Sequence, residues 1–285
     1  MSIPILIIIV VIALYLLLWL CRHRLLFSQN IACGKCLSSY EYDVKDFSIH
    51  IKGDGWLVRK KNAKIDNQKV FAIIMGAGGA KCCYLDIIKS CFLIDSCATV
   101  CIVDHLGYGG TRQTHSASLE QITKDIRRTQ RYLIYEGGFQ EITWVTHCIG
   151  TIFLLKTANL FEKTTLEVKQ KLLVINGLAN WYDGGVNFPS FLNWMPRFLE
   201  KIVVESVRKE LDARLELVDL VRTGVPIACV HTLNNKHVDV EHGRAISKII
   251  GSQHYHEIQK GRHVQLDLWS HLDAMGFIHK WYYNV

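Results

Sequence analysis

Residues 144–151 read WVTHCIGT, an apolar run that ends in a histidine, a cysteine and a glycine. Aromatic and β-branched residues before the cysteine favour a strand, and the apolar residues after Gly150 favour a helix. A cysteine on such a turn projects its thiol out of the sheet. The helix dipole and the free amides behind it favour the thiolate, which is the nucleophilic form. The stretch therefore predicts a nucleophile, Cys148, at a tight strand-to-helix turn.

The sequence around this stretch alternates between short β-branched apolar runs and longer segments with apolar residues at helical spacing. Strands are predicted at 47–52, 55–60, 69–75, 98–103, 141–146, 171–176, 225–231 and 254–259. Helices are predicted at 82–94, 117–135, 150–163 and 240–250. This order predicts an α/β protein with a mostly parallel central sheet and helices on both faces.

Residues suited to chemistry follow several of the predicted strands. In a parallel sheet, ligands and reacting groups collect at the carboxyl ends of the strands. The segments there are MGAGG (75–79), DHLGYGGT (104–111), HCIG (147–150) and HTLNNKHVDVEHGRA (231–245). The flexible backbone of the first segment can bring the amide of Ala77 opposite that of Ile149, so these two N–H groups are the predicted oxyanion hole.

The motifs MGAGG, DHLGYGGT, THCIG, HTLNNKHV and KGRH, in this order, resemble the α/β-hydrolase fold superfamily over roughly residues 50–285. The superfamily usually has serine in G-x-S-x-G, where this chain has Cys148, and glycine where it has Thr146. A cysteine at this position is similar to dienelactone hydrolases and polyhydroxyalkanoate synthases. HCIGT is also similar to the hydrolase-like domain associated with cholesterol-oxidase-type proteins.

The resemblance also implies a histidine base and an acid partner. KGRH makes His263 the expected base, and His271 is the alternative because WSHLDAMG (269–276) resembles the ending of acid lipases. Asn235 stands where the superfamily has aspartate. With a thiolate and an imidazolium already formed, the partner chiefly has to orient the ring, and Cys-His-Asn works on another fold. Asp239 and Asp183 remain alternative acids.

The N-terminus has its own pattern, because Ile3 to Cys21 contains no charged residue and Arg22 and Arg24 follow at once. This length suits one membrane-spanning helix. The basic residues after it favour a single-pass membrane protein with the bulk of the chain in the cytoplasm. The expected organisation is a transmembrane anchor (1–24), a juxtamembrane linker (25–46) and an α/β-hydrolase domain (47–285) with a small helical cap inserted at 178–222.

Composition argues against several other classes of function. The net charge of +7 comes from scattered residues without an aromatic-interleaved basic stripe, so nucleic acid is not an expected partner. Ten cysteines at irregular spacing predict small buried hydrophobes and not a disulfide framework. No H-E-x-x-H is present and GAGGAKC (76–82) lacks the ending of a phosphate-binding loop, so neither a metal nor a cofactor is expected.

The sequence therefore predicts a membrane-anchored, cysteine-dependent hydrolase of the esterase, thioesterase or lipase type. Its substrate would be an acyl ester or thioester of a lipid-like acid, processed through an acyl-enzyme. Membrane lipid is the other expected partner. Two alternatives remain open: a catalytically inactive hydrolase-like protein that binds a lipid or a protein, and an acyltransferase.

Overall fold

A computed structural model of the chain describes residues 13, 17, 41–49, 55–64, 66–76, 79–105, 118–157, 160–161, 167–180, 210–261, 263 and 271–284. Within these ranges eight strands form one sheet in the order β1-β2-β4-β3-β5-β6-β7-β8. Strand β2 pairs antiparallel with β1 and β4, and the remaining neighbours pair in parallel. The strands are β1 Tyr42–Phe47, β2 Gly55–Lys60, β3 Lys69–Ile74, β4 Thr99–Val103, β5 Glu141–His147, β6 Lys169–Ile175, β7 Ile227–Thr232 and β8 Tyr255–Ile258.

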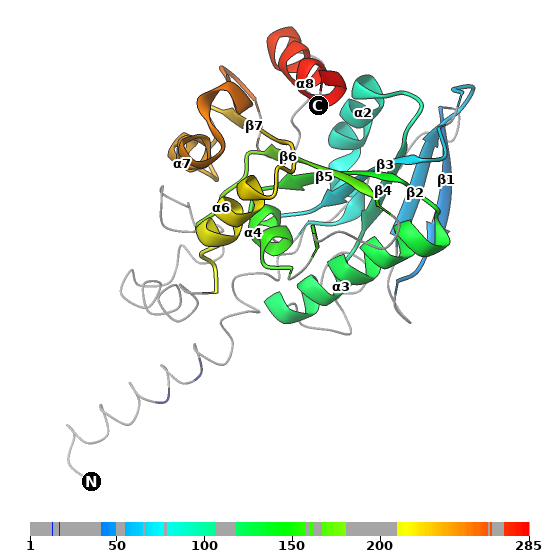
Figure 1. The fold of residues 1–285 in the computed structure, drawn as a ribbon, viewed down its shortest axis with the longest axis horizontal. Coiled ribbons are helices and arrows are strands. Elements are labelled where there is room, and N and C mark those ends of the chain that lie inside the picture. Colours follow the sequence, from blue (N-terminus) through cyan, green and yellow to red (C-terminus); the bar gives the residue numbers. More distant parts are fainter. Residues whose placement is uncertain are drawn as a thin grey trace, which may run out of the picture.

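Helices cover both faces of this sheet (Figure 1). The described α-helices are α2 Leu85–Ile94, α3 Leu119–Arg131, α4 Gly150–Leu155, α6 Arg214–Arg222, α7 Val240–Ile250 and α8 Leu272–Asn284. Short helical turns are η1 Lys81–Tyr84, the π-helical η3 Tyr132–Glu136 and η5 Ser252–His254. Side chains of α3, α4, α6 and α7 share one apolar core with the sheet, and those of α2 and α8 share the other. The mostly parallel, two-faced sheet predicted from the sequence is confirmed.

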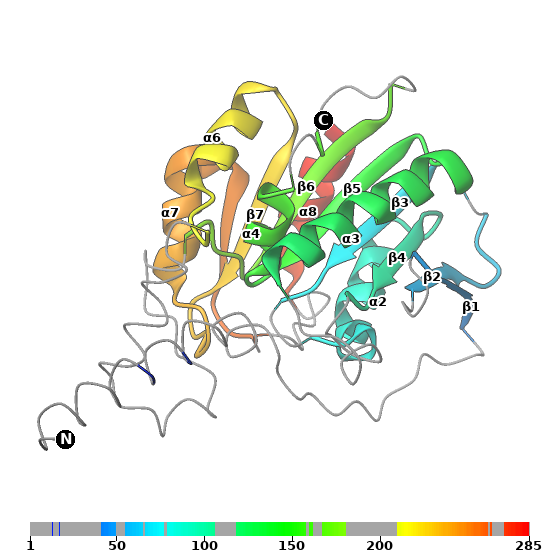
Figure 2. The same ribbon diagram turned by 90° about the horizontal axis from the view of Figure 1, so that it is seen from below.

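The central strands are buried along most of their length because helices cover both faces of the sheet. In β3, Val70, Ala72 and Ile74 lie in the core with α3 and α4, whereas Phe71 and Ile73 lie in the core with α2 and α8. Alternate residues of a strand face opposite sides of a sheet, so such a strand needs apolar residues at every position. Figure 2 shows the strands side by side from β1 at one edge to β7 near the other.

The prediction of a first strand at 47–52 is wrong in position. Strand β1 is Tyr42–Phe47, and its register with β2 runs from Tyr42 opposite Lys60 to Phe47 opposite Gly55. Most side chains of β1 are exposed. An edge strand is held by backbone pairing to one neighbour, so apolar alternation is a poor guide to where it begins.

The helix predictions differ mainly in where the helices end. The prediction of 240–250 is confirmed by α7, whereas the segment predicted as a helix over 150–163 contains α4, which ends at Leu155. Part of the expected cap, 210–222, contains α6, whose Leu217 and Leu220 are buried in the core with α3 and α4. The strongly apolar part of the expected cap lies outside the described residues.

The expected anchor and linker (1–46) also lie almost wholly outside the described residues. Among those described, no helix combines the length and apolar character that crossing a bilayer requires. Among the described residues, six cysteines form no disulfide, and burial raises the pKa of Cys91, Cys101 and Cys229, as expected for small buried hydrophobes. Cys82 is disulfide-bonded, contrary to the expectation of unpaired thiols, because cysteine spacing does not reveal pairing.

Candidate active site

Cys148 lies on a strained turn between β5 and α4. Its φ is +55°, the left-handed region that a residue with a Cβ enters at a cost of roughly 1–2 kcal/mol. Its N–H donates to the Ile175 carbonyl over 3.3 Å, and its own carbonyl accepts the Thr151 N–H over 3.2 Å. Cys148 is partly exposed, whereas its neighbours His147 and Ile149 are buried. The turn therefore presents the thiol at the carboxyl edge of the sheet.

Two glycines allow the backbone segments around this turn to approach closely. A Cβ at Gly150 would lie 2.5 Å from the carbonyl oxygen of Ile74, so a side chain there would force α4 away from β3. A Cβ at Gly76 would lie 2.8 Å from the Cβ of Cys148. The glycine loop after β3 is thus in direct contact with the cysteine turn. Any larger side chain at either position would separate the two.

Thr146 occupies the position where the superfamily pattern has glycine, and the structure shows how it is accommodated. Its hydroxyl is buried and lies 3.0 Å from the hydroxyl of Thr151 in α4. A Cβ at Gly177, just after β6, would overlap the Thr151 hydroxyl. The small residue that the close packing needs is therefore at Gly177 and not at 146, and the two threonine hydroxyls satisfy one another.

Hydrogen bonds of fixed direction connect Gly76 to the backbone of His263. The Gly76 N–H donates to the Tyr84 hydroxyl over 2.7 Å, and that hydroxyl lies 3.0 Å from Nδ1 of His147. Nε2 of His147 lies 2.7 Å from the carbonyl oxygen of His263. A carbonyl only accepts, so His147 carries its proton on Nε2, and Tyr84 donates to Nδ1.

The structure brings the side chains of Asn235 and His263 together. Nδ2 of Asn235 lies 3.0 Å from Nδ1 of His263. The ring of His263 lies 4.5 Å, centroid to centroid, from the ring of His147, the residue directly before Cys148. Residues far apart in the chain thus converge at the cysteine turn, because β5, β7 and β8 all end at this edge.

Asn176 fixes the loops that carry this pair. It follows β6 with φ +48° and is fully buried. Its Oδ1 accepts the N–H of Thr232 over 2.8 Å and the Thr232 hydroxyl over 3.1 Å. Its Nδ2 donates to the carbonyl oxygen of His263 over 3.3 Å. Asn176 therefore ties the end of β7 to the backbone of the histidine loop.

The histidines around the turn are held neutral by their surroundings. Burial lowers the pKa of His147 to about 4, although the bond to the His263 carbonyl acts in the opposite direction. Burial, with His147, His237 and His231 nearby, lowers the pKa of His263 well below its ordinary value. His231, whose Nε2–H donates to the Val238 carbonyl over 3.1 Å, has a pKa lowered by burial to about 4. At neutral pH none of these three rings carries a charge.

The other predicted site residues are placed elsewhere or lie outside the described residues. His271 directly precedes α8, where its carbonyl accepts the Met275 N–H. Asp239 is exposed and caps α7 through the Glu241 N–H. Ile149 directly precedes α4, so its amide lies at the N-terminal end of that helix. Ala77 and Asp183 lie outside the described residues.

Sequence reasoning did not find Tyr84, His147 and Asn176 as parts of this site. The only signal for His147 in the sequence is its position directly before the predicted nucleophile. Tyr84 and Asn176 act through contacts that join separate loops, and a single sequence does not reveal such contacts. Among the described residues, no three His, Cys, Asp or Glu side chains are placed to hold a metal ion.

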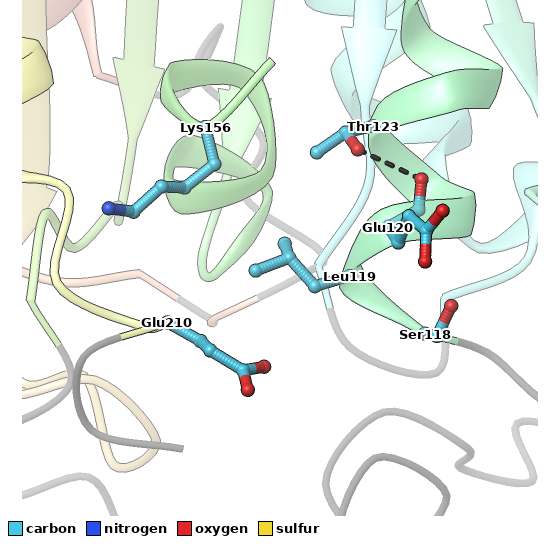
Figure 3. A pocket seen from close by; sticks show the side chains of 6 residues that line it. All are labelled: Ser118, Leu119, Glu120, Thr123, Lys156 and Glu210. Atoms are coloured by element: carbon cyan, nitrogen blue, oxygen red, sulfur yellow. Dashed lines mark hydrogen bonds between the residues drawn. The ribbon is translucent and has the colours of Figure 1, made fainter. Parts of the chain in front are cut away.

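A cavity of about 460 Å³ lies apart from these residues, between the start of α3 and the end of α4 (Figure 3). Its lining consists of Ser118, Leu119, Glu120, Thr123, Lys156 and Glu210. Lys156 pairs with Glu216 of α6 over 2.6 Å, which accounts for its charge. The cavity contains neither the thiol nor the Asn235 and His263 pair, so it is not the candidate active site.

No protein-family model matches the sequence, and no curated protein matches it. Solved structures do resemble the fold. An esterase of Pyrococcus furiosus superposes with a TM-score of 0.60 at 10% identity, over 90% of this chain and 97% of its own. Carboxyl esterase 2 of the fungus Tuber melanosporum gives 0.58 at 13% identity, over 85% of this chain and 86% of its own.

The acylaminoacyl peptidase of Pyrococcus horikoshii gives a TM-score of 0.57 at 13% identity over 85% of this chain. This chain spans only 40% of that peptidase. Together with the strand order, these likenesses show that the chain has the α/β-hydrolase fold.

Proposed function

We propose that this chain of α/β-hydrolase fold is a cysteine-dependent acyl hydrolase of the esterase or thioesterase type. The observation that carries the proposal is the left-handed, partly exposed Cys148 on the turn between β5 and α4, together with the contact between Asn235 and His263, whose ring lies 4.5 Å from that of His147. In this fold the reacting atoms gather at that edge of the sheet. A left-handed backbone at a residue with a Cβ costs free energy, and such residues cluster at functional sites.

In the proposed reaction the Cys148 thiolate attacks the acyl carbon. A carbon–sulfur bond forms as the bond to the leaving alcohol or thiol breaks, which gives an acyl-enzyme that water then hydrolyses. The amide of Ile149, at the N-terminus of α4, supplies one donor to the oxyanion. We assign the second donor to Ala77. Direct contact between Gly76 and Cys148 supports this assignment, because it brings the start of the glycine loop against the turn.

The proposed substrate is an acyl ester or thioester of a lipid-like acid, and the proposed location is a membrane. The uncharged run from Ile3 to Cys21, followed by Arg22 and Arg24, supports an N-terminal anchor with the bulk of the chain in the cytoplasm. An anchored active site would draw its substrate from the bilayer. Carbonate extraction of membranes that carry the full chain tests the anchor, and release into the soluble fraction would contradict it.

The function is tested by trapping the acyl-enzyme. The full-length protein, in detergent micelles, is incubated with a medium-chain acyl thioester, quenched in acid and analysed by intact mass and peptide mapping. We expect one acyl group per chain, on Cys148, and none in Cys148→Ala. Cys97→Ala is the matched control, since Cys97 is also a free, partly exposed thiol. A folded wild-type protein that forms no adduct on Cys148 with any acyl length contradicts the proposal.

A second candidate function is a catalytically inactive hydrolase-like protein that binds a lipid or a protein. The observation that favours it is Asn235, an amide where a hydrolase triad has a carboxylate. This candidate predicts no adduct, together with binding of the same acyl compounds that survives Cys148→Ala. An acyltransferase would instead form the adduct and pass the acyl group to an acceptor other than water.

A further inference from the structure

The orientation of the Asn235 side chain is fixed by two backbone groups. Its Oδ1 accepts the N–H of His237 over 2.9 Å and the N–H of Val238 over 3.0 Å. An N–H only donates, so the atom that faces both must be the amide oxygen. The NH₂ group of Asn235 is therefore the one that lies 3.0 Å from Nδ1 of His263.

This orientation determines where the proton of His263 lies. An amide NH₂ donates and cannot accept, so Nδ1 of His263 must present a lone pair to it. A neutral imidazole with a lone pair on Nδ1 carries its proton on Nε2. In a Ser-His-Asp triad the arrangement is the reverse, because the carboxylate accepts from Nδ1–H and leaves Nε2 free to take a proton.

Rotating the amide to restore the usual arrangement is costly. The NH₂ group would then face the N–H groups of His237 and Val238, so both of their hydrogen bonds would be lost and donors would oppose donors. A doubly protonated His263 would likewise point Nδ1–H at the NH₂ of Asn235. Burial of the ring and its histidine neighbours lowers the pKa of His263 further.

We infer that Asn235 holds His263 as the neutral Nε2–H tautomer, so that in the resting site the ring is a hydrogen-bond donor and not a base. This inference rests on the proposed function for its kinetic consequence. Cys148 gives its proton to solvent, and its thiolate then attacks the acyl carbon while the leaving group takes a proton from solvent. When water attacks the acyl-enzyme, a carbon–oxygen bond forms, the carbon–sulfur bond breaks to release the Cys148 thiolate, and the proton of the water goes to solvent. Hydrolysis of the acyl-enzyme is therefore slow, and the acyl-enzyme accumulates.

The test uses Asn235→Asp, with Asn234→Asp as its matched control. An aspartate at 235 can accept the two N–H groups through one oxygen and Nδ1–H of His263 through the other. Asn234 is the adjacent residue, and its Oδ1 accepts the Gly261 N–H over 3.1 Å. Asn234→Asp therefore adds the same negative charge one residue away and keeps an acceptor for the Gly261 N–H.

The first readout is the tautomer, measured by long-range proton–nitrogen NMR on full-length protein labelled with ¹⁵N-histidine, with His263→Gln to assign the signals. We expect the proton on Nε2 in the wild type and in Asn234→Asp, and on Nδ1 in Asn235→Asp. A wild-type His263 with its proton on Nδ1 would overturn the inference, as would a tautomer that Asn235→Asp leaves unchanged.

The second readout is the lifetime of the acyl adduct on Cys148. Because a positioned base contributes roughly 10²- to 10⁴-fold, Asn235→Asp should shorten this lifetime by about 10²-fold or more, and Asn234→Asp should leave it unchanged. An unchanged lifetime in Asn235→Asp overturns the kinetic part of the inference. If the tautomers are as expected but no variant forms an adduct, the proposed function fails while the assignment of the proton stands.

Discussion

The hydroxyl of Tyr84 lies 3.0 Å from Nδ1 of His147 and accepts the Gly76 N–H on its other side. Tyr84 precedes α2, His147 ends β5 and Gly76 follows β3, so one buried hydroxyl joins three segments that meet only in the folded chain. His147 extends the connection to the backbone of His263. Gly76 and the backbone of His263 are thus connected through Tyr84 and through His147, the residue directly before Cys148.

Removing this hydroxyl should affect both stability and acylation. Tyr84→Phe leaves the Gly76 N–H and Nδ1 of His147 buried without their partner, so we expect a loss of roughly 1–3 kcal/mol in the free energy of unfolding. Acylation of Cys148 should also slow, because the loop before Ala77 is released. Urea unfolding measures the loss of stability, and mass spectrometry of samples quenched at a series of times measures the rate of acylation. Tyr255→Phe, which loses a partly buried contact to Glu257, should slow acylation little; equal slowing in both variants would contradict this role of Tyr84.

Acidification should destabilise the protein through its buried histidines. The pKa values of His147 and His231 are lowered to about 4 in the folded state, against about 6.5 when unfolded. Between these values the unfolded chain binds the protons and the folded chain does not. The stabilisation is therefore complete above pH 6.5 and falls by up to about 1.4 kcal/mol per pH unit for each histidine as the pH drops towards 4. Urea unfolding at a series of pH values measures the slope.

One variant measures how much His231 contributes to the slope of unfolding free energy against pH. His231→Gln keeps a side-chain donor for the Val238 carbonyl and removes the titrating ring. We expect the slope of unfolding free energy against pH to fall by about one histidine's contribution. If the slope of the variant matches that of the wild type, His231 titrates normally in the folded protein.

The contrast between two glycines tests the close packing at the cysteine turn. Gly150→Ala places a Cβ against the carbonyls of Ile74 and Met75, so we expect a loss of more than about 2 kcal/mol, as backbone must shift. Gly276→Ala, in α8, meets open space and should stabilise the protein by roughly 0.5–1 kcal/mol. Thermal or urea unfolding compares the two. A mild effect at Gly150 would mean that α4 can move away from β3 freely.

A buried ion pair beside the glycine loop offers a further test. Lys81 and Asp104 pair over 3.3 Å, and Asp104 also accepts the Lys81 N–H over 2.7 Å. Asp104→Ala removes the carboxylate that faces the largely buried Lys81 ammonium and leaves it the weaker contact with the Trp56 ring, so the change should cost about 3–5 kcal/mol of unfolding free energy. Glu120→Gln, which breaks an exposed pair with Lys124, should change it by less than about 0.5 kcal/mol. Comparable losses in the two variants would show that the Lys81 pair is solvated.

The sequence predicts the fold well where burial dictates residue choice. Strands such as β3 and β5 are mostly apolar or β-branched because both of their faces are covered, and their positions follow from that. Strand β1 was misplaced because its side chains are mostly exposed and only its backbone pairs. Helix α6 falls within the segment predicted as a cap (178–222), and only Leu217 and Leu220 in it are buried, so its sequence gives a weak signal for a helix of the core.

The site was predictable as a set of residues but not in its hydrogen-bond directions. The pairing of Asn235 with His263 was implied by the resemblance of the motifs to the superfamily, and the structure brings the two side chains together. The amide of Asn235 turns its NH₂ group towards His263 because its oxygen accepts the N–H groups of His237 and Val238. The backbone of the turn positions these N–H groups, and the sequence does not reveal that geometry. Thr146 looked out of place because its compensation, Gly177, lies on another strand end.

The carbonyl of His263, and not its ring, receives the bonds from His147 and Asn176. These two hydrogen bonds to the backbone of residue 263 therefore do not depend on the chemical nature of its side chain. A protein engineer can exchange that side chain for another proton carrier, or for a nucleophile, and both backbone hydrogen bonds remain available. The fold thus provides a hydrogen-bonded backbone position at which the reactive side chain can be changed by a single substitution.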